Sequence, residues 1–166
     1  MSERRPGETP RSVVWISFAD EDQHWARWVR SHLESVGQGL YLDVRDHQGL
    51  RFRDGDEDSA LKAAISAAAV VLPLISRFYL TSPRVKRVDL PTIVGCRNNG
   101  ALMIPVLASP CPWRTVEWLH AVQMFPRGGR TLAGASEFQV DEHLADLAMH
   151  VFNEGLAHVR STEIAT

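Results

Sequence analysis

Short, uninterrupted apolar runs alternate along this chain with longer segments that repeat apolar residues at helical spacing. The runs are rich in β-branched and aromatic residues, as is typical of strands, and cover residues 13–18, 40–44, 70–75 and 101–107. The helical pattern is clearest after the acidic cluster at 20–22, where one stripe is apolar: Trp25, Trp28, Val29, Leu33 and Val36. Further helices are predicted over residues 57–68, from Ser82 onward, over 115–122 as a short helix, and over 141–158.

Strands that alternate with helices and are apolar on both faces indicate a parallel sheet covered on both sides. Four to five strands in this length give an α/β fold, a flavodoxin-like doubly wound parallel sheet. Ligands of such sheets bind beyond the carboxyl ends of the strands. These ends lie here at 18–20, in the long loop 46–56 and from Ser76 onward. The loop has no periodicity and two glycines, and long loops often carry function.

The run at 70–75 and the residues after it form the predicted centre of the molecule. We expect a buried strand, a turn over 77–82, and a helix with Ser82 at its N-cap and Pro83 at its first position. Asp89 is the only acid in this helix, and Pro91 should bend the helix early. Ser76 and Ser82 could be nucleophiles, but no histidine lies near them in sequence, so helix capping is the favoured interpretation.

The two ends of the chain are predicted to lie outside the folded domain. Residues 1–11 are polar with two prolines and are interpreted as a disordered lead-in. Residues 12–158 form the predicted domain, and 159–166 a tail. Pro105 places the run at 101–107 near an edge or an irregular end of the sheet.

Composition excludes several classes of function. The 166 residues carry a formal net charge of −2, which does not favour binding to nucleic acid or anionic lipid. Neither an apolar span long enough for a membrane nor a signal peptide is visible, and the two cysteines lack metal or disulfide spacing, so we expect a cytoplasmic protein. The spacing of His143 and His150 does not favour a metal site.

Five segments in order resemble a TIR (Toll/interleukin-1 receptor) domain of bacterial type. They are VVWISFADED from residue 13, LDVRD with the loop that follows it, VVLPLISRFYLTS from 70, MIPVLASPCPW from 103, and FPRGGRTLAGASEFQVDEHLADLAMHV from 125. The resemblance implies one of two activities. Some TIR domains release nicotinamide from NAD+, and others only assemble with further TIR domains into homo-oligomers or filaments. Both would suit a signalling or antiphage defence protein.

The resemblance also implies site residues. In active members a glutamate on the helix after the third strand carries the chemistry, often four residues after a tryptophan. These positions fall on Asp89 and Val85, and both depart from the pattern. Asp89 would lie at the ribose, where a carboxylate stabilises positive charge in the transition state. The NAD+ site would be completed by Phe18, Ala19, Arg51, Arg53 and Gly55.

Plainer interpretations of these residues stay open. The side chain of aspartate is one methylene shorter than that of glutamate, and a misplacement of about 1 Å can cost a hundredfold in rate, so weakened or absent NAD+ cleavage is expected unless the site is remodelled. Asp89 could instead form an ion pair on the helix surface, with Arg84, Lys86 or Arg87. Phe18 could be a core aromatic, and loop 46–56 could be a solvated turn. A phospho-receiver domain has the same architecture, but Ser76 stands where its aspartate should be.

Overall fold

A parallel sheet of five strands lies at the centre of the structure, a computed structural model that describes residues 11–164 and their side chains through Gly155. The strands run in the order β2-β1-β3-β4, with β5 also pairing with β3. Their bounds are β1 Ser12–Ser17, β2 Leu42–Arg45, β3 Val70–Ile75, β4 Leu102–Met103 and β5 Val106–Leu107. Every pairing is parallel, which confirms the predicted sheet. Residues 1–10 and 165–166, from the predicted lead-in and tail, lie outside the described residues.

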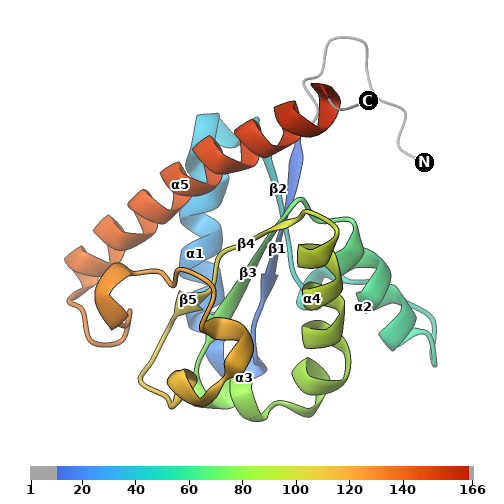
Figure 1. Ribbon diagram of the computed structural model, residues 1–166, viewed down its shortest axis with the longest axis horizontal. Coiled ribbons are helices and arrows are strands. Elements are labelled where there is room, and N and C mark those ends of the chain that lie inside the picture. Colours follow the sequence, from blue (N-terminus) through green and yellow to red (C-terminus); the bar gives the residue numbers. More distant parts are fainter. Residues whose placement is uncertain (1–10, 165–166) are drawn as a thin grey trace.

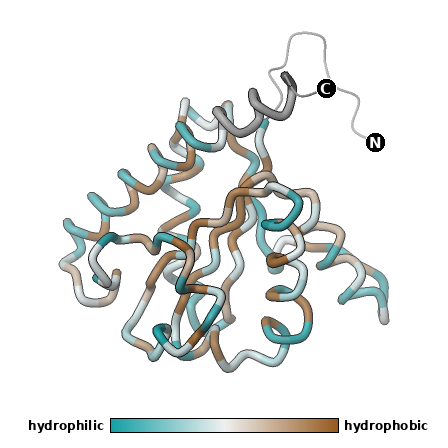
Figure 2. The backbone as a smooth tube through the Cα atoms, viewed as in Figure 1, coloured by the Kyte–Doolittle hydropathy of each residue, from teal (hydrophilic) through white to brown (hydrophobic). Residues whose placement is uncertain are grey.

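Helices cover both faces of this sheet (Figure 1). On one face α1 (Gln23–Ser35) and α5 (Glu137–Ile164) pack over a core that includes Ile16 and Leu72. On the other face α2 (Glu57–Ser66) and α4 (Leu90–Asn98) pack over Trp15 and Val71. Apolar residues lie along the strands, and polar residues lie along the outer faces of the helices (Figure 2). This arrangement explains why all six residues of β3 are buried.

The start of the chain differs from its prediction in detail. The acidic cluster forms a 3-10 turn, η1 (Asp20–Asp22), before α1 begins. Trp25 and Trp28 stack on each other with ring centroids 5.9 Å apart and are only partly buried, so they border the core instead of lying in it. The helical region ends in η2 (Val36–Gly39), where Gly37 has a φ of 55°.

The segment after β3 holds more helix than predicted. The expected turn is a short helix, α3 (Arg77–Thr81), because the Ser76 hydroxyl accepts a hydrogen bond from the Tyr79 amide and caps it. The predicted cap at Ser82 is present, since its hydroxyl accepts from the Val85 amide at 3.3 Å. A π-helical turn, η4 (Val85–Asp89), then leads into α4, with Pro91 in the first turn of α4.

Later segments are more irregular than predicted. Pro105 lies between β4 and β5 and splits the run into two short strands at the sheet edge, as its missing amide requires. In place of a helix over 115–122, the chain forms single 3-10 turns, η5 (Trp113–Thr115) and η6 (Glu117–Leu119). Another such turn, η7 (Arg127–Gly129), precedes α5, which begins four residues earlier and runs further than predicted. Loop 46–56 contains the turn η3 (His47–Gly49).

Candidate functional site

A buried chain of polar side chains lies where β1 and β3 end. Asp89 is 0% exposed, and its Oδ2 accepts a hydrogen bond from the Ser17 hydroxyl at 2.7 Å. The Ser17 Oγ lies 3.0 Å from the Tyr79 hydroxyl. Since Ser17 has one proton and donates it to Asp89, Tyr79 must be the donor to Ser17. Burial raises the pKa of Tyr79 above its ordinary value, which keeps this donor protonated.

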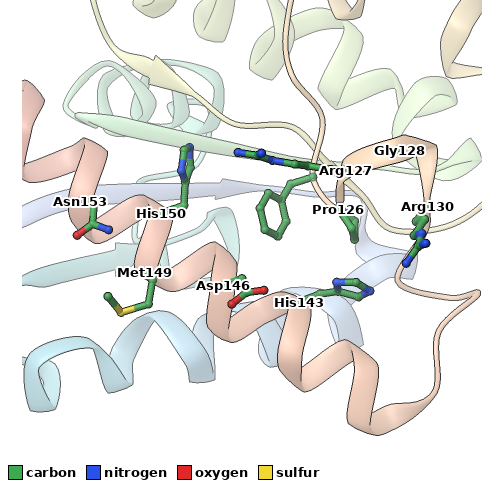
Figure 3. Close-up of a pocket in the computed structure, with 10 residues that line it drawn as sticks. Pro126, Arg127, Gly128, Arg130, His143, Asp146, Met149, His150 and Asn153 are labelled. Atoms are coloured by element: carbon green, nitrogen blue, oxygen red, sulfur yellow. The ribbon is translucent and has the colours of Figure 1, made fainter.

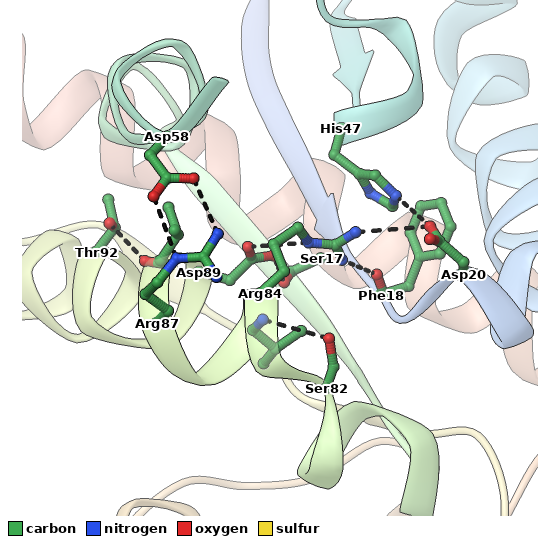
Figure 4. Close-up of polar contacts among 12 residues, drawn as sticks. Ser17, Phe18, Asp20, His47, Asp58, Ser82, Arg84, Arg87, Asp89 and Thr92 are labelled. Carbon is green, nitrogen blue, oxygen red and sulfur yellow. Dashed lines mark hydrogen bonds and ion pairs between the residues drawn. The ribbon is translucent and has the colours of Figure 1, made fainter. Parts of the chain in front are cut away.

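Arg84 covers the other oxygen of Asp89. Its Nε lies 3.4 Å from Asp89 Oδ1, an ion pair that closes the carboxylate off from solvent. Within the described residues, neither of these two atoms has a hydrogen-bond partner of good geometry. The guanidinium also donates to the Phe18 carbonyl oxygen and lies 3.5 Å from Asp20 Oδ1 (Figure 4). Arg84 therefore bridges the helix of Asp89 and the end of β1.

The π-helical turn explains how Arg84 reaches Asp89. In an α-helix the side chains that face each other are three or four residues apart, whereas these two are five apart. In η4 the Leu90 amide bonds to the Val85 carbonyl, a five-residue step that widens the turn. The widened turn brings Arg84 over the carboxylate. Such single π-turns are frequent at functional sites.

A second polar layer surrounds the end of β1. His47, from η3, lies 2.7 Å from Asp20 Oδ1 through its Nε2, and its ring lies 4.7 Å from the Phe18 ring. The hydrogen bond from His47 lowers the pKa of Asp20. Phe18 and Ala19 are each 1% exposed, so they form the wall behind these polar groups and present no open surface.

Asp22 and Ser76 form a separate buried pair. The Ser76 hydroxyl donates to the Asp22 carboxylate. Burial raises the pKa of Asp22 above its ordinary value of 3.8, against the opposing effect of this hydrogen bond. Neither serine that was considered as a nucleophile is free for that role. Ser76 caps α3 and donates to Asp22, and Ser82 accepts from the Val85 amide.

The remaining predicted site residues are not gathered around Asp89. Val85 is 2% exposed and packs in an apolar cluster with Tyr79 and Leu119. Arg51, Arg53 and Gly55 are exposed and make no side-chain hydrogen bond or ion pair with Asp89 in the described part of the chain. The alternative of an ion pair on the helix surface is correct in the pairing and wrong in the location. Asp89 does pair with Arg84, but its carboxylate is buried.

A hollow lies on the outer side of Arg84. It has a volume of about 480 Å³ and is lined by Asp20, Glu21, Phe78, Thr81, Ser82, Pro83, Arg84 and Arg87. Asp89 is not among its lining residues, since Arg84 stands between them. Arg87 is held at its rim by Asp58, at 3.1 Å. In this conformation a ligand in the hollow contacts Arg84 and not the carboxylate behind it.

Two residues of this cluster were not predicted from the sequence: Ser17 and Tyr79. Ser17 is the last residue of a strand whose neighbours are apolar, so its position beyond a sheet edge was the available signal. Arg84 was predicted only as one of three surface partners of Asp89, because the residue pattern does not show the π-turn that buries the pair. Elsewhere among residues 11–164, no group of three or more His, Cys, Asp and Glu side chains is placed to hold a metal.

None of the described helices is long and apolar enough to cross a lipid bilayer. The comparison with curated proteins found no match. Among solved structures, the crystal structure of a diflavin flavoprotein A3 from Nostoc sp. is similar at a TM-score of 0.52 and 16% identity, over 90% of this chain and 99% of that one. At this identity the likeness shows the fold alone, a flavodoxin-like α/β fold. Residues 14–134 match the family model described as TIR domain, and as this match covers more than half of the sequence, the chain belongs to the TIR domain family.

Proposed function

We propose that this TIR domain acts in signalling or defence by associating with other TIR domains, and that Asp89 serves as an internal structural residue. The observation that carries the proposal is the setting of Asp89. Its carboxylate is fully buried, accepts a hydrogen bond from Ser17 and is neutralised by Arg84. A carboxylate that stabilises charge on a ribose must face the substrate, and this one faces the protein interior.

Loop 46–56 is the proposed contact surface. Phe52 is 49% exposed within it, and charged residues of both signs flank it: Arg51, Arg53, Asp54 and Asp56. An exposed aromatic ringed by charges suits a protein interface, where aromatic anchors supply most of the binding energy. Because the loop carries both signs of charge, it can meet a second copy of the same surface.

Sedimentation velocity over a concentration series tests this proposal. Wild-type protein should form larger species as concentration rises, and Phe52→Asp should remain monomeric at every concentration. Phe138→Asp is the matched control, because Phe138 is 71% exposed at the start of α5, outside the loop. Association that persists in Phe52→Asp, or a wild-type protein that stays monomeric, would argue against the proposal.

NAD+ cleavage is the second candidate, favoured by the hollow outside Arg84. If the Arg84 side chain swung outward, this hollow would open toward Asp89, whose Oδ1 has no other partner among the described residues. Arg84→Ala would then release nicotinamide from NAD+ faster than wild type, and the double variant with Asp89→Asn would lose that gain. If Arg84→Ala shows no more release than Arg87→Ala, the candidate is excluded for this route.

A further inference from the structure

A second, larger hollow lies between α5 and the segment 125–130, which follows η6 in the chain. Its volume is about 770 Å³, within the range of small-molecule pockets. One wall is the segment 125–130, and the other is the face of α5 that carries His143, Asp146 and His150 (Figure 3). None of its lining residues belongs to the buried cluster around Asp89.

Basic side chains line this hollow in two pairs. Arg127 and His150 share one end and also border a smaller hollow of about 140 Å³. Arg130 and His143 share the other end and border another of about 380 Å³. Within residues 11–164 neither arginine forms an ion pair, and Asp146 is the one acid in the lining. Unpaired guanidinium groups present forked donors that match phosphate oxygens.

Apolar side chains also line the hollow, among them Phe125 and Met149. The Phe125 ring stacks against His150, with centroids 6.5 Å apart and planes 24° from parallel. The backbone of Phe125 is held on both sides, since its amide donates to the Pro105 carbonyl at 2.9 Å and its carbonyl accepts from Leu107 at 2.7 Å. Because the backbone of Phe125 is already fixed to the sheet edge, little conformational entropy is lost there when a ligand binds.

We propose that this hollow binds a small nucleotide, with its phosphate on Arg127 or Arg130 and its ring against Phe125 and His150. A flat ring and a phosphate match the two kinds of side chain in the lining, apolar and basic. A metal is disfavoured because the lining offers a single carboxylate. The proposal is independent of the assembly proposed above, since it uses other residues.

The experiment is a titration of the ¹⁵N-labelled 166-residue protein with adenosine 5′-monophosphate, followed by NMR. Saturable shifts should be confined to residues 125–130 and 143–153. Of Arg127→Gln and Arg130→Gln, the variant that loses the charge-assisted hydrogen bond to the phosphate should weaken binding by about tenfold or more. Arg97→Gln, a charge-matched change at the end of α4, should leave affinity unchanged.

The controls define what overturns the proposal. Adenosine, which has the ring without the phosphate, should bind about tenfold more weakly than the nucleotide. Equal binding of adenosine, equal loss in Arg97→Gln, or no saturable shift with the nucleotide each contradicts the assignment. Binding to vesicles of anionic phospholipid without binding to the nucleotide would also contradict it. Both arginines are exposed, so their variants should keep the dispersed spectrum of a folded protein.

Discussion

Replacing Ser17 with alanine tests whether Asp89 is held in the interior as described. Ser17→Ala removes the hydroxyl that donates to Asp89 at 2.7 Å and accepts from Tyr79 at 3.0 Å. All three side chains are buried, so water does not replace the lost partner. The backbone of β1 should be unaffected, because alanine is smaller than serine and the strand hydrogen bonds involve main-chain atoms alone.

The expected cost follows from the two bonds. A hydrogen bond to a charged group contributes about 1.5–3 kcal/mol, and a buried hydroxyl left without an acceptor costs about 1 kcal/mol more. We therefore expect Ser17→Ala to lower the free energy of unfolding by about 2.5–4 kcal/mol. Domains of this kind have a total free energy of unfolding of about 5–15 kcal/mol, so this loss would be a large fraction of it.

Urea unfolding at 25 °C, followed by tryptophan fluorescence, measures this free energy. Ser59→Ala is the matched control, since Ser59 is exposed on α2 and its loss should change stability by less than about 0.5 kcal/mol. A double-mutant cycle with Tyr79→Phe should give a coupling of about 1 kcal/mol, because the Tyr79 hydroxyl has no partner once Ser17 is gone. A Ser17→Ala protein as stable as the control, with no coupling to Tyr79, would refute the internal arrangement of Asp89.

Three further predictions concern pH, the backbone and the contact between α1 and α5. Burial raises the pKa of Asp22 above 3.8, so the folded state binds the carboxyl proton more tightly than the unfolded state does. Ionised Asp22 therefore destabilises the folded state as the pH rises above about 4. Asp22→Asn should therefore gain melting temperature relative to wild type, by circular dichroism, as pH goes from about 4 to 7; a constant difference would contradict this. Gly37→Ala should lower the urea midpoint far more than Gly55→Ala. Both glycines have positive φ, but an added Cβ at Gly37 would clash with the Tyr41 ring, whereas one at Gly55 would meet open space. Equal effects would show that backbone strain, and not this clash, sets the cost. Asp141 accepts a hydrogen bond from Trp28 Nε1 at 2.6 Å but is exposed. Asp141→Asn should therefore lower the free energy of unfolding by less than about 1 kcal/mol in the same assay, and a larger loss would contradict this expectation.

Much of the fold could be predicted because the strand runs are apolar on both faces. The run at 70–75 became β3 with the same bounds, since it lies at the centre of the sheet and every side chain is buried. Prediction failed where local hydrogen bonds decide the structure. The Ser76 cap turned an expected loop into α3, and the missing amide of Pro105 divided one expected strand into β4 and β5.

The candidate site could be predicted only in part. The family resemblance grouped Asp89 with Phe18 and Ala19, and the hydrogen bond from Ser17 shows that the carboxylate does lie beside the end of β1. The sequence offered Arg84 as one of three possible partners of Asp89. It could not reveal the π-turn that places these two residues on the same side of the helix and buries the pair. Nor could it show that loop 46–56 leaves Arg53 and Gly55 away from the carboxylate. These features depend on tertiary packing and not on local pattern.

Nicotinamide release from NAD+ is the most direct test of the claim that Asp89 serves the fold and not a reaction. The assay compares concentrated, assembled wild-type protein with Asp89→Asn, after confirming by circular dichroism that the variant is folded. The account predicts no release above the rate without protein from either one. Release by wild type that disappears in folded Asp89→Asn would show that the carboxylate reaches substrate, and would contradict the account.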